Sequence, residues 1–176
     1  METIAEVLSE SSLCGAIGMI LALFGTNPYP FDRLIEALDK YSKETGVKII
    51  VQSGNTPPLG ETLECHSFVN HSTLAKWIAE AEVVVSQGGF GSLADCIAQG
   101  ARTVAVPRDN ALGESVDDQK ELVNALADEG LVEPVYDISD LPKAVNRVRG
   151  LERKPVLQSG MPDHVAKTIE KMIFER

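Results

Sequence analysis

The feature that most constrains the fold is a regular alternation, from residue 19 onward, between short apolar runs and segments with helical periodicity. Four runs are nearly continuous in apolar residues, which is typical of strands covered on both faces. They are 19–24, 47–52, 83–86 and 103–106, with weaker candidates at 63–66 and 132–135. Between them, apolar residues recur at i, i+3, i+4 and i+7, which predicts amphipathic helices. The predicted helices are 31–46, 74–81, 92–99, 117–129, 141–148 and 164–174.

A strand followed by a helix about six times indicates a parallel sheet with right-handed crossovers. The predicted fold class is therefore α/β, a Rossmann-like open parallel sheet of about six strands with helices on both faces. With 176 residues and 44% apolar content, the chain fits one domain. We assign that domain to residues 18–176, and residues 1–17 to an N-terminal extension that forms a peripheral helix or is partly disordered.

The net charge argues against two classes of partner, and the acidic residues near the N-terminus argue against a secretory signal. The net charge of −10 argues against nucleic acid, because no basic stripe is present to displace counterions from a phosphate backbone. It also disfavours direct adsorption to anionic lipid, so any membrane contact needs an intermediary. The apolar segment 13–24 follows Glu2, Glu6 and Glu10 and so lacks the basic lead of a secretory signal. We therefore expect a cytoplasmic protein.

The cysteines and histidines show no pattern of a metal site. Cys14, Cys65 and Cys96 are odd in number and lie in apolar surroundings, which favours reduced thiols over disulfides. His66 and His71 lie near each other, but His164 is far away in the sequence, and no matching acidic set accompanies them. We expect no metal ion and no cofactor.

Three loops that follow predicted strands combine small residues with hydroxyl or amide groups. In an open parallel sheet, ligands bind at the carboxyl ends of the strands. Glycine lets the backbone approach a ligand closely, and the N-terminus of a following helix attracts negative charge. These loops could together hold a diphosphate without a metal, although each alone is compatible with an ordinary turn. Their candidate residues are Gly25 and Thr26, Ser53, and Gln87, Gly88, Gly89, Gly91 and Ser92.

The glycine-rich loop SQGGFGS at 86–92 differs from two common phosphate-binding motifs. A dinucleotide fingerprint has the spacing GxGxxG and follows the first strand, whereas this loop follows the fourth predicted strand. The loop also lacks the Lys-Ser/Thr ending of a P-loop. A dinucleotide enzyme and an NTPase are therefore disfavoured.

Four charged or amide side chains near these loops are further candidates. Asp95 lies in the helix after the glycines, where it could accept hydrogen bonds from ribose hydroxyls or act only as a favourable charge in a first helical turn. Arg108 directly follows a strand and could face a phosphate or a partner, or be a solvated surface arginine. Asp118 and Gln119 could reach sugar hydroxyls or serve as helix caps.

Two segments carry a resemblance to a known family: FGTNPYPFDRLIEALD at 24–39 and SQGGFGSLADCIAQGARTVAVPRDNALGESVDDQ at 86–119. Together they resemble the donor-binding half of glycosyltransferase family 28. The pattern is similar to the single-domain subunits of two-part transferases that build bacterial exopolysaccharide or dolichol-linked oligosaccharide from UDP-sugars. The resemblance covers roughly residues 19–130 and implies the fold of the C-terminal half of a GT-B glycosyltransferase.

The resemblance implies roles for several residues. Gly25, Thr26 and the loop from Gly88 to Ser92 would bind the diphosphate and sugar of a UDP-sugar. Phe68 and Val69 would lie near the uracil, and Glu114, Asp118 and Gln119 would approach the donor sugar. Two positions depart from the family pattern: Asp95 stands where a glutamate usually holds the ribose, and Gln87 stands where a histidine is common.

The implied reaction is inverting transfer of a hexosyl group to a lipid-linked acceptor. The residues reveal no convincing general base for the acceptor proton, and the resemblance implies a separate membrane-anchored subunit that holds the acceptor at the cytoplasmic membrane face. An alternative is a non-catalytic UDP-sugar-binding or scaffolding module with the same fold. A sugar-nucleotide epimerase of the same general fold is disfavoured, because such enzymes need a second domain.

Overall fold

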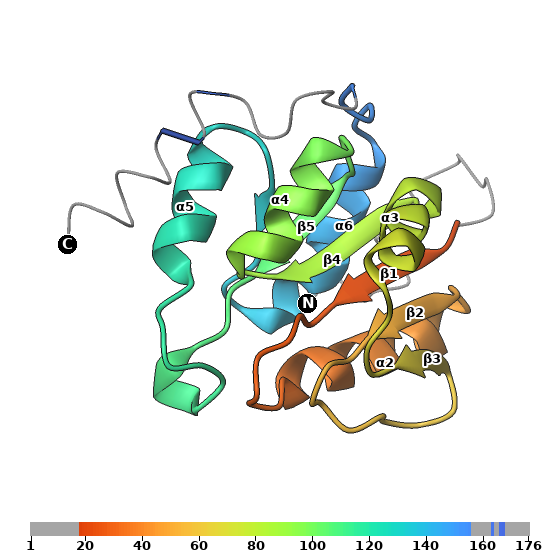
Figure 1. Ribbon diagram of the computed structural model, residues 1–176. Coiled ribbons are helices and arrows are strands. Elements are labelled where there is room, and N and C mark those ends of the chain that lie inside the picture. Colours follow the sequence, from red (N-terminus) through yellow and green to blue (C-terminus); the bar gives the residue numbers. More distant parts are fainter. Residues whose placement is uncertain (1–17, 156–162, 164–165, 168–176) are drawn as a thin grey trace, which may run out of the picture.

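The computed structural model describes residues 18–155, 163, 166 and 167, and its centre is one parallel sheet (Figure 1). Six strands pair in the order β3-β2-β1-β4-β5-β6, and every pair is parallel. The strands are β1 (Ile20–Leu23), β2 (Ile49–Gln52), β3 (Leu63–His66), β4 (Val83–Gln87), β5 (Thr103–Val106) and β6 (Glu133–Pro134). The predicted α/β fold class is confirmed, including its two weaker strands.

Within residues 18–155, five α-helices cover the two faces of the sheet. They are α2 (Asp32–Thr45), α3 (His71–Glu80), α4 (Phe90–Ala98), α5 (Lys120–Asp128) and α6 (Leu141–Arg149). Helices α2 and α6 pack on one face, and α3, α4 and α5 pack on the other (Figure 1). Two short 3-10 helices, η1 (Asn110–Leu112) and η2 (Ile138–Asp140), lie in the loops after β5 and β6. The predictions for 1–17 and for a helix at 164–174 fall almost entirely outside the described residues.

The composition of β1 shows why the central runs are continuously apolar. Ile20 and Ala22 face the layer of α2 and α6, whereas Leu21 and Leu23 face the layer of α3 and α4. All four side chains are fully buried, because successive residues of a strand point to opposite faces and both faces are covered. An alternating apolar and polar pattern would expose one face to water.

The strand order reverses between β1 and β4. From β1 the chain continues toward β2 and β3 on one side of the sheet, and β4 begins the other side. In open parallel sheets the loops that leave the carboxyl ends of two such strands run in opposite directions, and ligands bind in the crevice between these loops. The candidate residues near Gly25 and Gln87 therefore lie at this crevice.

Candidate functional site

The turn after β1 contains a glycine whose backbone has the left-handed conformation. Gly25 has a φ of +69°, and its backbone is clamped by the side chain of Gln52 at the end of β2. The Gly25 N–H donates to Gln52 Oε1 at 3.0 Å, and Gln52 Nε2 donates to the carbonyl oxygens of Gly25 at 3.1 Å and Ser67 at 2.9 Å. Sequence reasoning missed Gln52. Its signal is an uncharged polar residue that ends an otherwise apolar strand.

The carboxamide of Gln87 lies between this turn and the glycine-rich loop. A Cβ atom added to Gly25 would lie 1.9 Å from Gln87 Nε2, and one added to Gly89 would lie 2.9 Å from it. The amide thus fills the space that both glycines leave empty, and the Gln87 residue is only 6% exposed. Three predicted site residues, one in the turn after β1, one at the end of β4 and one in the loop after β4, therefore lie together.

The three glycines of the loop have different roles. Gly88 is buried, and a Cβ there would meet Gln119 and Val123 at 2.9 Å, so its missing side chain lets β4 pack against the start of α5. Gly89 faces the Gln87 amide and is the N-cap residue of α4. Gly91 has no neighbour within 4 Å of an added Cβ. Of the three, Gly91 offers the open surface that a ligand needs for close approach.

Helix α4 begins at Phe90, two residues before the predicted start at Ser92. The difference places Gly91 and Ser92 in the first turn, where backbone N–H groups have no partner within the helix. No side chain caps this N-terminus in the described structure. The positive end of the helix dipole therefore faces the crevice without a competing anion, which suits a phosphate group.

The earlier helix start also changes the position of Asp95. This residue lies in the second turn, so its interpretation as a charge in the first helical turn is wrong. Its Oδ1 atom is 3.7 Å from Nε2 of His71 at the start of α3. The carboxylate is partly exposed and stays compatible with a contact to ligand hydroxyl groups.

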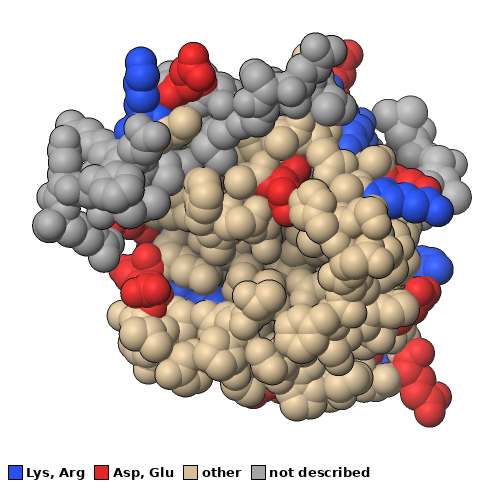
Figure 2. Space-filling model, in the orientation of Figure 1, with Lys and Arg blue, Asp and Glu red and all other residues tan. Residues whose placement is uncertain are grey.

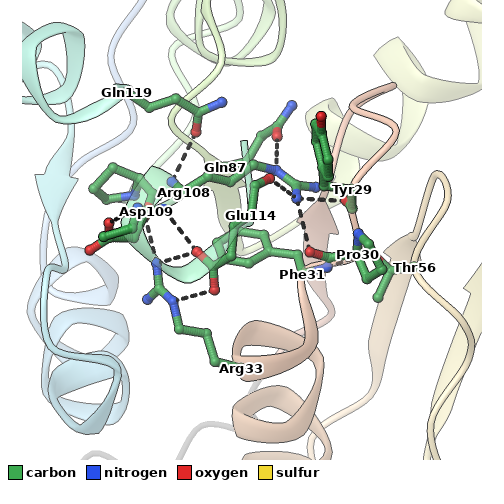
Figure 3. Close-up of polar contacts among 12 residues, drawn as sticks. Tyr29, Pro30, Phe31, Arg33, Thr56, Gln87, Arg108, Asp109, Glu114 and Gln119 are labelled. Atoms are coloured by element: carbon green, nitrogen blue, oxygen red, sulfur yellow. Dashed lines mark hydrogen bonds and ion pairs between the residues drawn. The ribbon is translucent and has the colours of Figure 1, made fainter. Parts of the chain in front are cut away.

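Arg108 is buried beneath the loops instead of exposed at the surface (Figure 3). It is only 1% exposed, and its guanidinium is 4.5 Å from the ring centroid of Phe31. The hydrogen bonds run from Nε to Gln87 Oε1 (2.6 Å), from Nη1 to the carbonyl oxygens of Tyr29 (2.8 Å), Pro30 (3.4 Å) and Glu114 (3.0 Å), and from Nη2 to that of Phe24 (3.0 Å). The interpretation as a solvated arginine is wrong. The prediction of a direct phosphate contact also needs correction, because the guanidinium is turned toward protein oxygens.

Glu114 is likewise directed inward. Its carboxylate accepts from Arg33 Nε at 2.7 Å and Nη2 at 3.0 Å, and from the backbone N–H of Asp109 at 2.8 Å. Glu114 is 7% exposed, so the prediction that it approaches a donor sugar needs correction: the carboxylate is committed to Arg33. Sequence reasoning missed Arg33, because its partner is 81 residues away in the chain.

Asp118 and Gln119 precede α5, which begins at Lys120. Asp118 is exposed, and its Oδ1 accepts from the Lys120 backbone N–H at 2.9 Å. Gln119 is the N-cap residue but forms no side-chain cap bond; its Oε1 accepts from the backbone N–H of Arg108 at 3.0 Å. Asp118 therefore keeps one carboxylate oxygen toward solvent, whereas Gln119 supports the loop after β5.

The remaining candidates lie in the loops after β1, β2 and β3. Thr26 and Phe68 are exposed, Val69 is half-buried, and Ser53 is buried. The Oγ of Ser53 has no hydrogen-bond partner among the described residues. Figure 2 shows that most charged side chains in this view lie toward the margin, with an acidic group near the centre.

The buried cluster beneath the crevice carries an excess of positive charge. It contains the buried guanidinium of Arg108, the half-buried guanidinium of Arg33 and the carboxylate of Glu114, whereas the neighbouring carboxylate of Asp109 pairs with Lys120. Burial lowers the pKa of Arg108 to about 10, and the carboxylate of Glu114 opposes this shift. Arg108 therefore stays protonated at neutral pH. A buried cation is costly unless paired, and Arg108 itself bonds only to neutral oxygens.

Two absences hold for the part of the chain that the structure describes. No group of three or more His, Cys, Asp or Glu side chains is placed to hold a metal ion. Within the same residues, no helix is long and apolar enough to cross a membrane.

The sequence matches one family model, and the fold resembles that of solved glycosyltransferase structures. The family model described as the glycosyltransferase family 28 C-terminal domain matches residues 20–173. Similar solved structures include the glycotransferase of kitacinnamycin (TM-score 0.57, 18% identity, 78% of this chain), MurG of Acinetobacter baumannii (0.56, 18%, 88%) and the calicheamicin glycosyltransferase CalG4 (0.55, 14%, 89%). No curated protein matches the sequence.

These structures are larger than the present chain. It covers 36% of the kitacinnamycin enzyme, 49% of MurG and 37% of CalG4. At these identities the likeness shows the fold, a Rossmann-like sheet shared with GT-B glycosyltransferases, and the family model extends over most of the chain. The protein therefore belongs to the glycosyltransferase family 28 C-terminal domain family.

Proposed function

We propose that the chain binds a UDP-sugar at the crevice between β1 and β4 and is the donor-binding, catalytic part of an inverting hexosyltransferase. The observation that carries the proposal is the meeting of the Gly25 turn, the Gln87 amide and the uncapped N-terminus of α4. The Gln87 NH₂ group and the N–H groups at the start of α4 are donors suited to a diphosphate, and the Gly25 turn, which has no side chain, leaves space beside them. Membership of family 28 and the likeness to glycosyltransferase structures support it.

In this proposal the crevice stabilises the charge of the leaving UDP. Backbone N–H groups at Gly91 and Ser92 and the dipole of α4 act in place of a divalent cation, so no metal is required. The exposed Phe68 and the neighbouring Val69 contact the uracil. Asp95 and Asp118 accept hydrogen bonds from sugar hydroxyl groups.

The proposal places the acceptor on a second protein. An acceptor hydroxyl group must be held opposite the donor, and a general base must remove its proton. The chain spans less than half of the glycosyltransferases that it resembles, and the matching family model is that of the C-terminal domain. We propose that a membrane-anchored subunit binds a lipid-linked acceptor and recruits the chain to the cytoplasmic membrane face.

Calorimetric titration of UDP into the full chain tests donor binding. We expect saturable binding, and at least about tenfold weaker binding for Gly89→Asp, because the new carboxylate would lie beside the Gln87 amide and repel the diphosphate. Gly150→Asp is the matched control, since Gly150 follows α6 and has a negative φ like that of Gly89, and a Cβ there would meet no atom closer than 3.6 Å. Absence of UDP binding by the parent chain would refute the proposed function.

Transferase assays separate the enzyme from the alternative of a non-catalytic binding module. We expect the purified chain to transfer little sugar and to gain activity when the membrane-anchored subunit is added. Robust transfer by the chain alone would contradict the two-part arrangement. UDP binding without turnover in the presence of the partner would instead favour the non-catalytic module.

A further inference from the structure

The orientation of the Gln87 carboxamide is fixed by chemistry. Arg108 Nε is 2.6 Å from the Oε1 atom of Gln87, and a guanidinium can only donate hydrogen bonds. The amide oxygen must therefore face Arg108, and the NH₂ group must face the opposite side. Figure 3 shows the nitrogen of Gln87 turned away from the guanidinium.

The NH₂ group of Gln87 is directed at the space between Gly25 and Gly89. Its nitrogen is the atom that an added Cβ on either glycine would approach most closely. None of the hydrogen bonds found among the described residues uses this nitrogen as a donor. A side chain that is 94% buried thus presents a donor of fixed direction to the crevice.

Arg108 also links the loops that form the crevice. Its guanidinium bonds to the end of β1 at Phe24, to the segment before α2 at Tyr29, and to the loop after β5 at Glu114. The cation lies directly behind the Gln87 amide, and hydrogen bonding to its oxygen polarises the amide and strengthens the NH₂ group as a donor.

We propose, on the basis of the proposed function, that Arg108 is a positioning residue that fixes Gln87 as an uncharged donor to the diphosphate of the sugar nucleotide. Arg108 acts through Gln87 and does not touch the ligand. The excess positive charge of the cluster of Arg33, Arg108 and Glu114 is compensated when the diphosphate binds above it.

Gln87→Glu tests this proposal because it should change the affinity for UDP without lowering the stability of the fold. The new carboxylate would accept the same hydrogen bond from Arg108 and gain a charge-assisted pair, so the melting temperature should stay the same or rise. The second carboxylate oxygen would replace the NH₂ group and repel the diphosphate. We expect UDP to bind at least about tenfold more weakly and uridine to bind within about twofold of the parent chain. Gln99→Glu, the same change at the other end of α4, should leave both affinities unchanged.

Arg108→Lys is a second variant for the case in which Gln87→Glu does not fold. Lysine keeps the positive charge but loses the planar fork that holds the amide, so UDP binding should weaken more than uridine binding. Equal UDP affinity in the folded Gln87→Glu variant and the parent, or equal losses for UDP and uridine, would overturn the proposal and leave the proposed function intact. A parent chain that binds no UDP would overturn both.

Discussion

Replacement of Arg108 by leucine is expected to lower the free energy of unfolding by about 3 to 5 kcal/mol. Arg108 is the largest fully buried side chain among the described residues. Removal of its guanidinium leaves Gln87 Oε1 and the carbonyl oxygens of Phe24 and Tyr29 without their donor. A buried acceptor that loses its partner keeps the full penalty of desolvation. Urea denaturation measures the loss, which is large against the total stability of about 5 to 15 kcal/mol that is usual for a domain.

Arg147→Leu is the control for the loss of an arginine. Arg147 donates to Glu133 Oε1 at 2.7 Å, but its side chain is 58% exposed, so this variant should lose no more than about 1 kcal/mol. Similar unfolding free energies for the two leucine variants would mean that the Arg108 cluster does not hold the loops together.

Replacement of Gly25 by alanine is expected to weaken UDP binding by at least about 100-fold. An alanine at a φ of +69° is strained, and its Cβ would lie 1.9 Å from Gln87 Nε2. Relief of this contact requires the turn or the amide to move, and both form the proposed diphosphate site. Calorimetric titration of UDP measures the loss.

Gly46→Ala separates backbone strain from the loss of the site. Gly46 ends α2 with a φ of +70°, and a Cβ there would meet nothing within 4 Å. This variant should lose about 1 kcal/mol of stability and keep its affinity for UDP. If Gly25→Ala bound UDP as well as Gly46→Ala does, the β1 turn would not contribute to the site.

The sheet was predictable because strands that are buried on both faces are apolar at nearly every position. The runs at 19–24, 47–52, 83–86 and 103–106 are apolar at every or nearly every position, and such runs arise when helices cover both faces. Helix starts were less predictable. Helix α4 begins at Phe90 because Gly89 is its N-cap residue, and no Ser, Thr, Asp or Asn marks that position.

The buried polar cluster could not be predicted, because it depends on contacts between distant segments. The pairing of Arg33 with Glu114 joins residues 81 positions apart, and Arg108 reaches carbonyl oxygens 84 and 79 positions earlier. A charged residue directly after a strand is often solvated, so the pattern around Arg108 left two interpretations open, a surface position and a contact with a phosphate or a partner, and a buried position was not among them. Gln52 was overlooked for a related reason, since its partners are backbone atoms of Gly25 and Ser67 in two other loops.

Locating the UDP-binding site on the protein would test the proposed donor site most directly. Titration of UDP into the ¹⁵N-labelled full chain, followed by amide chemical shifts, should move the resonances of Gly25, Gly89 and Gly91 at the crevice between β1 and β4. Gly100 and Gly130 lie at the amino ends of β5 and β6, whereas the proposed site lies at the carboxyl ends of the strands. The chemical shifts of these two amides should stay unchanged. Shifts centred on Gly100 and Gly130, or no shifts at millimolar UDP, would contradict a donor site at this crevice.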